Sequence, residues 1–354
     1  MNHSFDLDAI RRMNESELKE CAADLRMFLL EKVSRKGGHL SSNLGAVELT
    51  LALVRAFDVP NDKIIFDVGH QSYAYKAVTG RADLFDSLRD MDGLSGFPKR
   101  RESVYDAFDS GHSSNSISAA IGMAKARDLK KESYSVVSVI GDGSLTGGEA
   151  FEGLNNASML DSGLIIILND NGMSISRNVG GLTKGLTALR SAAGYNKVKK
   201  GVKNRLDASP LGESVIRALV NAKDSVKELI MPTGMVFENI GIKYLGPVDG
   251  HDILSMQSVF LRAKKMNRPV LIHVLTEKGK GYRLAEKHPS YFHGIGPFDL
   301  STGRERSDGR EVTYSDLFGA FMEKEADAHP EIVSVTAAMG SGVGLRSFKR
   351  WLNS

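Results

Sequence analysis

Runs of apolar residues that alternate with amphipathic stretches predict an α/β protein. Short runs rich in β-branched residues are typical of buried strands, and they occur at residues 63–68, 136–140, 164–168, 241–247 and 269–275. The stretches between them have helical periodicity, with apolar residues three and four positions apart. Because strands that alternate with helices form parallel sheets covered on both faces, we expect a doubly wound, mostly parallel sheet.

The first long helix has recognisable start and stop signals. Its apolar positions extend from Leu18 to Leu29, and Asn14 and Glu17 have the spacing of a capping box. Two glycines at residues 37–38 indicate its end. The almost wholly apolar stretch at residues 47–57 predicts a buried helix. Further helices are expected at residues 117–126, 143–159, 212–229, 253–264 and 314–326.

Three segments depart from this pattern. Residues 80–105 are polar and contain several glycines, which predicts a long surface connection. Residues 177–206 contain eight Lys or Arg and no acid; we expect a solvated, mobile basic insertion reaching about residue 210, or alternatively a basic lid over a phosphorylated substrate. Nucleic-acid binding is disfavoured because Tyr195 is its only aromatic residue. Residues 300–312 indicate a linker, and a strand is expected at residues 332–336.

Composition narrows the class of protein. The chain of 354 residues is 42% hydrophobic and 25% charged, with a net charge of +3, as in ordinary globular proteins. A single cysteine, Cys21, excludes internal disulfides and lies on the apolar stripe of the first helix. The N-terminus has no hydrophobic signal segment, and no apolar run is long enough to span a membrane. We therefore expect a cytoplasmic protein.

Polar residues follow two of the predicted strands. Gly141-Asp142-Gly143 comes after the second strand, and Asn169-Asp170-Asn171 comes after the third. Oxygen ligands on neighbouring strand ends suit Mg²⁺ or Ca²⁺, and the helix that follows Gly143 directs its N-terminus at the same place, which favours a diphosphate site. A dinucleotide fold is disfavoured because Thr146 stands where its motif requires glycine. A plain turn capped by Asp142 would not explain the second motif.

Histidines next to glycines form a second pattern. His39, His70, His112 and His251 directly follow a glycine, and His293 directly precedes one. Because two of them lie at strand-to-helix turns, the pattern indicates polar side chains that converge at the mouth of one parallel sheet. A zinc site is disfavoured, since none of these histidines has the helical spacing of zinc ligands.

Eight motifs in this order resemble the 1-deoxy-D-xylulose-5-phosphate synthase family: Gly38-His39, Asp67-Val68-Gly69-His70-Gln71, Gly111-His112-Ser113-Ser114, Gly141-Asp142-Gly143, Asn169-Asp170-Asn171, Gly246–His251, Lys278–Tyr282 and Phe292-His293-Gly294. The resemblance covers residues 5 to about 345. It implies a thiamine-diphosphate-binding domain at residues 1–299 and a linker at residues 300–312. Residues 313–354 would be the truncated beginning of a second, pyrimidine-binding domain. Asn115 replaces the threonine usual in the third motif, and we expect little effect.

The resemblance implies an enzyme that condenses pyruvate with D-glyceraldehyde 3-phosphate, releasing CO₂, on the route to isoprenoids and thiamine. Thiamine diphosphate and Mg²⁺ are its expected cofactors. Asp142, the Asn171 side chain and the Met173 carbonyl would bind the metal, and His39 and His293 would be catalytic. The cofactor-binding residues would be His70, Gly111, His112, Ser113, Gly143, Ser144, Asn171 and Tyr282.

The C-terminal region departs from the family pattern. The resemblance places an essential glutamate and phosphate-binding arginines beyond Thr336, and neither set is present here. We therefore expect this chain to be inactive alone. Its expected partners are a second copy, in a homodimer, a separate chain that supplies the missing domains, or both. Two alternatives are a non-catalytic homologue that binds Mg²⁺ and thiamine diphosphate, and half of a split transketolase-like enzyme.

Overall fold

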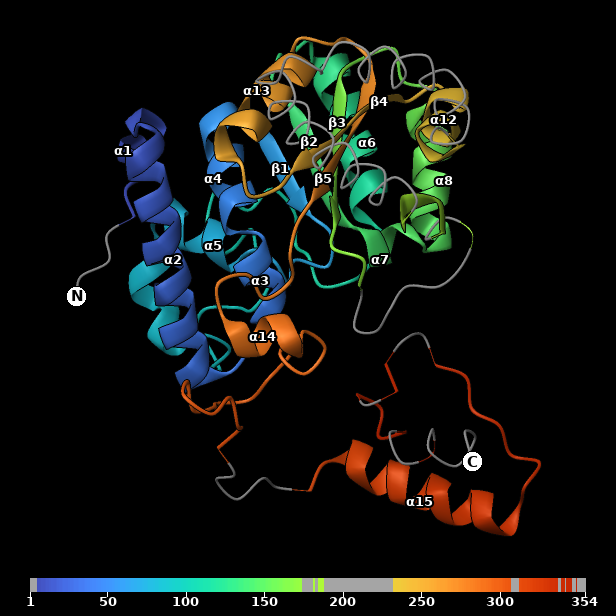
Figure 1. Ribbon diagram of the computed structural model, residues 1–354. Coiled ribbons are helices and arrows are strands. Elements are labelled where there is room, and N and C mark those ends of the chain that lie inside the picture. Colours follow the sequence, from blue (N-terminus) through green and yellow to red (C-terminus); the bar gives the residue numbers. More distant parts are fainter. Residues whose placement is uncertain are drawn as a thin grey trace, which may run out of the picture. The chain divides into compact units, whose positions relative to one another are not determined.

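Five parallel strands form one sheet in the computed structural model, which describes residues 5–173, 181, 184–187, 232–306, 312–336, 339–340, 342–345 and 348. Helices cover both faces of this sheet (Figure 1), so the predicted doubly wound parallel sheet is confirmed. The order across the sheet is β1 (Lys63–Phe66), β2 (Val136–Gly141), β3 (Leu164–Asp170), β5 (Pro269–Leu275) and β4 (Lys243–Asp249).

Successive residues of a central strand enter two different hydrophobic cores. Val137 and Val139 of β2 belong to one core, whereas Val136 and Ile140 belong to the other. This follows from the two-residue period of a strand, and burial on both faces explains why the strands are continuously apolar. The first core includes α2 (Glu15–Lys36), α4 (Val47–Ala56) and α13 (Ile253–Lys264); the second includes α6 (Ser116–Lys130) and α8 (Gly148–Ala157).

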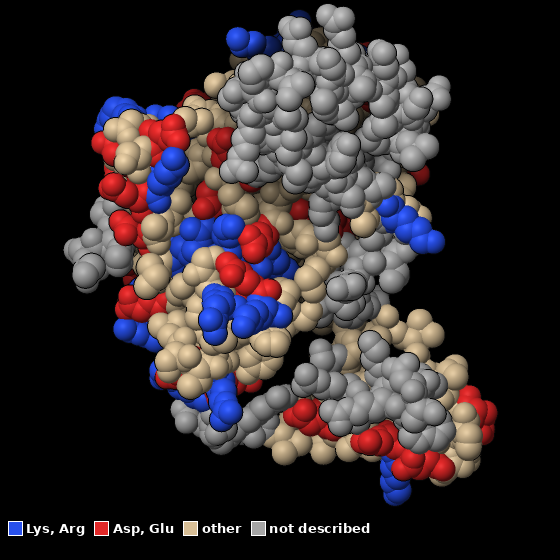
Figure 2. All heavy atoms as spheres, in the orientation of Figure 1, with Lys and Arg blue, Asp and Glu red and all other residues tan. Residues whose placement is uncertain are grey.

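The shorter helices lie before or after these elements. They are α1 (Leu7–Arg12), α3 (Ser41–Gly45), α5 (Tyr73–Lys76), α7 (Asp142–Leu145), α12 (Pro232–Asn239) and α14 (Arg283–Lys287). Figure 2 shows acidic and basic side chains interspersed over the described surface of one face, which agrees with the small net charge. No helix among the described residues is both long and apolar enough to cross a bilayer.

Two elements differ from the expected boundaries. The helix predicted to extend from residue 143 to residue 159 is divided into α7 and α8, with Gly147 between them. A Cβ at Gly147 would lie 2.2 Å from Ser114 Oγ, so a tertiary contact sets this break. Strand β4 continues past Pro247 to Asp249, with a register shift between Leu245 and Val248, because proline has no N–H for the ladder.

The expectation of a surface connection at residues 80–105 is wrong in part. A π-helical turn, η1 (Ala77–Arg81), and a 3-10 helix, η2 (Ala82–Ser87), precede a series of turns. The side chains of Phe85 and Leu88 are fully buried. The segment therefore packs on the first core, and its polar residues include partners in buried ion pairs.

The chain divides into two compact units, Met1–Gly303 and Arg304–Ser354. The second contains α15 (Tyr314–Ala328), whose N-terminus has a capping box formed by Thr313 and Asp316. The strand expected at residues 332–336 is absent from these described residues; a lone strand there would leave its backbone groups without a partner. The predicted helix at residues 212–229 and most of the basic insertion at residues 177–210 lie outside the described residues.

The N-terminus of α2 confirms the predicted capping box. Asn14 Oδ1 accepts hydrogen bonds from the N–H groups of Ser16 (2.9 Å) and Glu17 (3.1 Å), and the Glu17 carboxylate accepts one from the N–H of Asn14 (2.7 Å). The helix ends at Gly37, whose φ of +74° favours glycine.

Replacing Asn14 by alanine should lower the free energy of unfolding by about 1 kcal/mol, because two N–H groups at the helix start lose their acceptor. Urea unfolding of the chain measures this change. Glu20→Ala, an exposed substitution inside the same helix, should stay within about 0.5 kcal/mol of the wild type. Equal stability of the Asn14→Ala variant and the wild type would contradict the role of the cap.

Candidate active site

The predicted metal ligands follow two strands that are paired in the sheet. Gly141 of β2 lies opposite Asn169 of β3, so Asp142 and Asn171 follow adjacent strand ends. Asp142 is buried, with 2% of its surface exposed, and begins α7. Asn171 is half-buried, and its Oδ1 accepts a hydrogen bond from the N–H of Met173 at 3.1 Å. The three residues therefore lie at one edge of the sheet.

Asn169 ties this edge to two other segments. Its Nδ2 donates to Oε1 of Gln71 at 2.8 Å, and its Oδ1 accepts from the hydroxyl of Thr276 at 2.6 Å. Asn169 is buried. These bonds hold the end of β3 against the turn that follows β1 and the loop that follows β5.

Asp170 belongs to a buried hydrogen-bonded chain across three strands. Its Oδ2 lies 2.8 Å from Nε2 of His273 in β5, and Nδ1 of His273 lies 2.8 Å from the hydroxyl of Tyr244 in β4. Oδ1 of Asp170 accepts from the N–H of Gly172 at 3.0 Å. Asp170 thus holds the backbone that carries Asn171 and Met173.

Three of the glycine-flanked histidines lie together. The ring centroids of His39 and His70 are 5.6 Å apart, those of His39 and His293 are 5.6 Å apart, and those of His70 and His293 are 5.3 Å apart. His251 instead pairs with the carboxylate of Glu48 at 3.1 Å. His112 is exposed. Sequence reasoning therefore found the cluster but could not tell which histidines belong to it.

Backbone contacts bring the three histidines together. The buried side chain of Asn43 donates two hydrogen bonds of 2.7 Å, one to the carbonyl of His39 and one to that of His70. Gly38 and Ile295 exchange two backbone hydrogen bonds, of 2.8 and 3.0 Å, which place His293 beside them. Sequence reasoning assigned no role to Asn43, and only its place five residues after Gly38 hinted at one.

A second hydrogen-bond network positions the predicted phosphate-binding loops. The buried carboxylate of Asp67 accepts from the N–H groups of Ser114 (2.8 Å) and Ser116 (3.0 Å). The hydroxyl of Ser114 donates to the carbonyl of Ser144 at 2.8 Å. These bonds bring together two groups of predicted cofactor ligands: exposed Gly111, His112 and Ser113, and half-buried Gly143 and Ser144.

The clustered imidazoles are neutral at pH 7. Burial lowers the pKa of His39 to about 4 and that of His293 to about 3, and it lowers the pKa of His70 well below its usual value. Although each ring is partly exposed, Nδ1 of His39 and Nδ1 of His70 are buried and have no hydrogen-bond partner among the described residues. Both nitrogens therefore lack the partner that a buried ring nitrogen usually has.

Lys278 connects the histidines with the acidic edge. Its positive charge further lowers the pKa of His39, His70 and His293. Burial lowers the pKa of Lys278 itself to about 8, and the charge of Asp142 opposes that shift. The sequence analysis named Lys278 within a motif but assigned it no role; the available signal was a lysine in a glycine-rich loop just after a strand.

Tyr282 lies in an aromatic group. Its ring packs edge-on against Phe292, with centroids 5.5 Å apart, and lies 6.3 Å from Phe298. Its hydroxyl donates to the carbonyl of Leu300 at 2.8 Å. Among the residues predicted to bind a cofactor, Tyr282 therefore offers its ring rather than a free hydroxyl.

The residues at this edge fit the Mg²⁺ and thiamine diphosphate that the resemblance implies. Asp142, Asn171 and a backbone carbonyl are hard oxygen donors, which Mg²⁺ prefers. A Cβ added to Gly111 or Gly141 would meet nothing within 4 Å, so there is open space beside both. No three His, Cys, Asp or Glu side chains in the described ranges form a metal-ligand group, so an ion here would depend on amide and backbone oxygens as well.

Solved structures share this fold. Transketolase from Campylobacter jejuni matches with a TM-score of 0.57 over 96% of this chain and 48% of its own, at 19% identity. Transketolase from Leishmania mexicana matches with a TM-score of 0.57 over 88% and 48%, at 18% identity. The chain is therefore an α/β protein with the transketolase fold.

Sequence comparison defines the family. A family model described as 1-deoxy-D-xylulose-5-phosphate synthase matches residues 2–276. The synthases of that name from Clostridium beijerinckii and Clostridium acetobutylicum are 53% and 52% identical over 96% and 98% of this chain. The chain belongs to the 1-deoxy-D-xylulose-5-phosphate synthase family, as the motifs predicted. It spans 55% of the length of these two relatives.

Acid should destabilise the chain through the histidine cluster. Histidine titrates near pH 6.5 in an unfolded chain, whereas burial lowers the pKa of folded His39 to about 4. Between pH 6.5 and pH 4 the unfolded state binds a proton that the folded state does not. As the pH is lowered through this range, the free energy of unfolding therefore falls by up to about 1.4 kcal/mol per pH unit for each such histidine.

His39→Asn should therefore make the loss of stability below pH 6.5 shallower than in the wild type. Urea unfolding at a series of pH values from 7.5 down to 5 measures the slope. A variant slope as steep as that of the wild type would show that His39 is not held neutral.

Proposed function

We propose that this chain binds Mg²⁺ and thiamine diphosphate and supplies the diphosphate-binding half of a 1-deoxy-D-xylulose-5-phosphate synthase. The observation that carries the proposal is the meeting of two sets of groups at one sheet edge. One set is the pair of strand ends at Asp142 and Asn171, and the other is the cluster of three neutral imidazoles, with the charge of Lys278 acting on both.

The binding roles follow the predicted residues. Asp142, the side-chain oxygen of Asn171 and the carbonyl of Met173 would hold Mg²⁺. The neighbouring loops would hold the cofactor through His70, Gly111, His112, Ser113, Gly143, Ser144, Asn171 and Tyr282. Bound thiamine diphosphate supplies a nucleophilic carbon and an electron sink.

His39 and His293 would handle protons. A neutral imidazole both accepts and donates hydrogen bonds, and the buried Nδ1 of His39 has no protein partner among the described residues. His293 Nδ1 lies 3.4 Å from the hydroxyl of Ser42, which orients the ring. His39 and His293, as neutral imidazoles, would accept or donate a proton during the reaction, and the buried surroundings limit exchange with water.

The proposed substrates are pyruvate and D-glyceraldehyde 3-phosphate. Residues 1–299 would form the binding domain, residues 300–312 a linker, and residues 313–354 the beginning of a pyrimidine-binding domain. The proposed partners are a second copy of the chain, in a homodimer, or a separate chain that supplies the missing residues. A cytoplasmic location remains part of the proposal.

The alternative is a homologue that binds Mg²⁺ and thiamine diphosphate without catalysis, or half of a split transketolase-like enzyme.

Thiamine diphosphate should bind the chain only when Mg²⁺ is present, and Asp142→Ala should weaken binding at least tenfold, because the metal loses its only carboxylate ligand. Isothermal titration with and without Mg²⁺ measures both effects. Asp161→Ala, at an exposed position beyond α8, is the control and should bind as the wild type does. Binding of equal strength without the metal would refute the proposed site.

The purified chain alone should not form 1-deoxy-D-xylulose 5-phosphate from pyruvate and D-glyceraldehyde 3-phosphate, even with both cofactors. The resemblance places the glutamate that activates the cofactor in the part of the relatives that this chain does not span. CO₂ release and product chromatography measure the reaction. Product formation at the rate of a full-length relative would overturn this expectation.

A further inference from the structure

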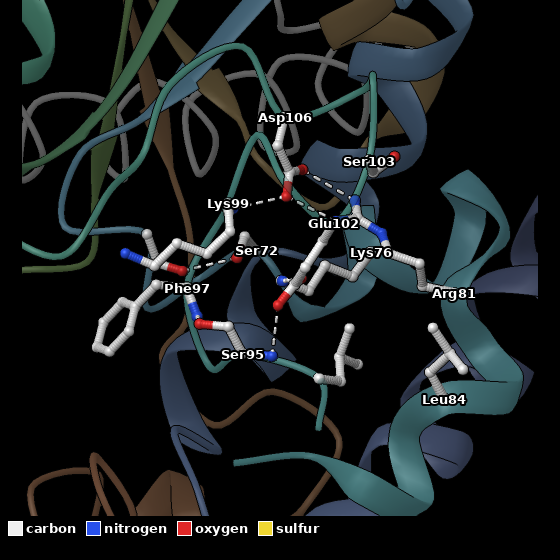
Figure 3. Close-up of polar contacts among 12 residues, drawn as sticks. Ser72, Lys76, Arg81, Leu84, Ser95, Phe97, Lys99, Glu102, Ser103 and Asp106 are labelled. Carbon is white, nitrogen blue, oxygen red and sulfur yellow. Dashed lines mark hydrogen bonds and ion pairs between the residues drawn. The ribbon is translucent and has the colours of Figure 1, made fainter. Parts of the chain in front are cut away.

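Two ion pairs with buried basic side chains lie outside the proposed ligand set. Lys76 of α5 has a fully buried side chain, and its Nζ lies 2.5 Å from Oε2 of Glu102. Arg81 of η1 donates two hydrogen bonds, of 2.6 and 2.9 Å, to the two carboxylate oxygens of Asp106, and both side chains are buried. Figure 3 shows the pairs side by side, with both carboxylates contributed by the segment that follows η2.

Each carboxylate also binds the backbone of its own segment. Oε1 of Glu102 accepts from the N–H of Ser95 at 2.7 Å, and Oδ2 of Asp106 accepts from the N–H of Lys99 at 2.8 Å. Both bonds span seven residues. Ser95 and Lys99 thus become two fixed points of the backbone, and residues 96–98 lie between them (Figure 3).

Of the three residues between the fixed points, Phe97 contacts a clustered histidine, and Gly96 and Pro98 contact residues next to the cluster. The ring of Phe97 lies edge-on to His39, with centroids 5.6 Å apart. A Cβ at Gly69, the residue before His70, would lie 2.4 Å from Pro98 Cδ, so Pro98 packs directly on that turn. A Cβ at Gly96 would lie 3.3 Å from the hydroxyl of Tyr73.

Stability alone does not account for this arrangement. Removing two charges from water is costly, and apolar side chains of similar volume often serve a core equally well. Directed hydrogen bonds, above all the two from Arg81 to Asp106, fix geometry in a way that apolar packing does not. Burial lowers the pKa of Lys76, which shows that its charge is held at a desolvation cost.

We propose that Glu102 and Asp106, held by Lys76 and Arg81, are positioning residues that press Phe97 and Pro98 against His39 and the Gly69-His70 turn. The effect of these two carboxylates on cofactor affinity rests on the proposed function, whereas their effect on the position of Phe97 against the His39 ring does not. Glu102 acts through the N–H of Ser95, and Asp106 through the N–H of Lys99. Neither carboxylate touches the proposed cofactor ligands.

Two double variants, each without the charges of Lys76 and Glu102, separate the effect of the hydrogen bond to the N–H of Ser95 from the effect of the ion pair. Lys76→Met with Glu102→Gln removes both charges but keeps a side-chain acceptor for the N–H of Ser95. Lys76→Met with Glu102→Leu removes both charges and the acceptor. As a control, Lys32→Met with Asp86→Leu removes an ion pair between α2 and η2, 2.7 Å long, in which Asp86 is exposed.

The first readout needs no cofactor. The ¹H–¹³C NMR resonance of the His39 ring, assigned through His39→Gln, reports the ring current of Phe97. The Glu102→Leu double variant should shift this resonance toward its position in Phe97→Leu, while the Glu102→Gln double variant and the control should keep the wild-type position. The second readout is titration with Mg²⁺ and thiamine diphosphate, where the Glu102→Leu double variant should bind at least tenfold more weakly.

Wild-type resonance position and affinity in the Glu102→Leu double variant would overturn the proposal. If that variant does not fold, Ser95→Pro replaces it. This substitution removes the donor N–H and also the hydroxyl that accepts from the N–H of Phe97 at 3.2 Å, and an unchanged His39 resonance there overturns the proposal equally. Absence of cofactor binding by the wild-type chain would refute the proposed function but not this inference. The NMR comparison would still decide whether these residues position Phe97.

Discussion

The side-chain amide of Asn43 is the interaction on which the candidate active site depends. Its two N–H groups reach the carbonyls of His39 and His70, and its oxygen accepts the N–H of Tyr73 at 2.8 Å. A buried amide whose partners belong to two segments, the one that contains His39 and the one from His70 to Tyr73, fixes those segments relative to one another. Aspartate has the same size but no N–H to donate, and alanine would leave three buried backbone groups without a partner. The residue that organises the site is therefore not among its proposed ligands.

The sheet and its helices could be predicted because their signals are local. Helix α13 and strand β5 have the predicted boundaries, since Asp252 caps the helix and the strand is apolar except at His273. The break at Gly147 could not be predicted, because it depends on the approach of Ser114 from another loop. The prediction of a strand at residues 332–336 was wrong. β-branched residues favour an extended backbone, but they do not supply the partner strand that a sheet requires.

The candidate site was predicted less completely than the fold, for a related reason. Strand ends of a parallel sheet meet at one edge, so a histidine after a strand-end glycine is a good candidate. The pattern could not separate His251 from the others, since its partner Glu48 lies 203 residues away in the sequence. Nor could the pattern distinguish Glu102 from the solvated acids of residues 80–105, because only the tertiary fold determines which of these side chains becomes buried.

Contacts of very long range complete the histidine cluster, and this has a consequence for how the chain folds. Ser41 donates to the carbonyl of Pro289, 248 residues further on, and Ser42 meets His293 across 251 residues. The entropy lost in closing a flexible loop grows with its length, and non-local contacts slow folding. We expect the intervening sheet to order first, because it shortens the effective loop. On a ribosome, the segment that carries His39 and His70 would emerge long before His293, and the nascent chain would contain an incomplete cluster until the first unit was almost fully synthesised.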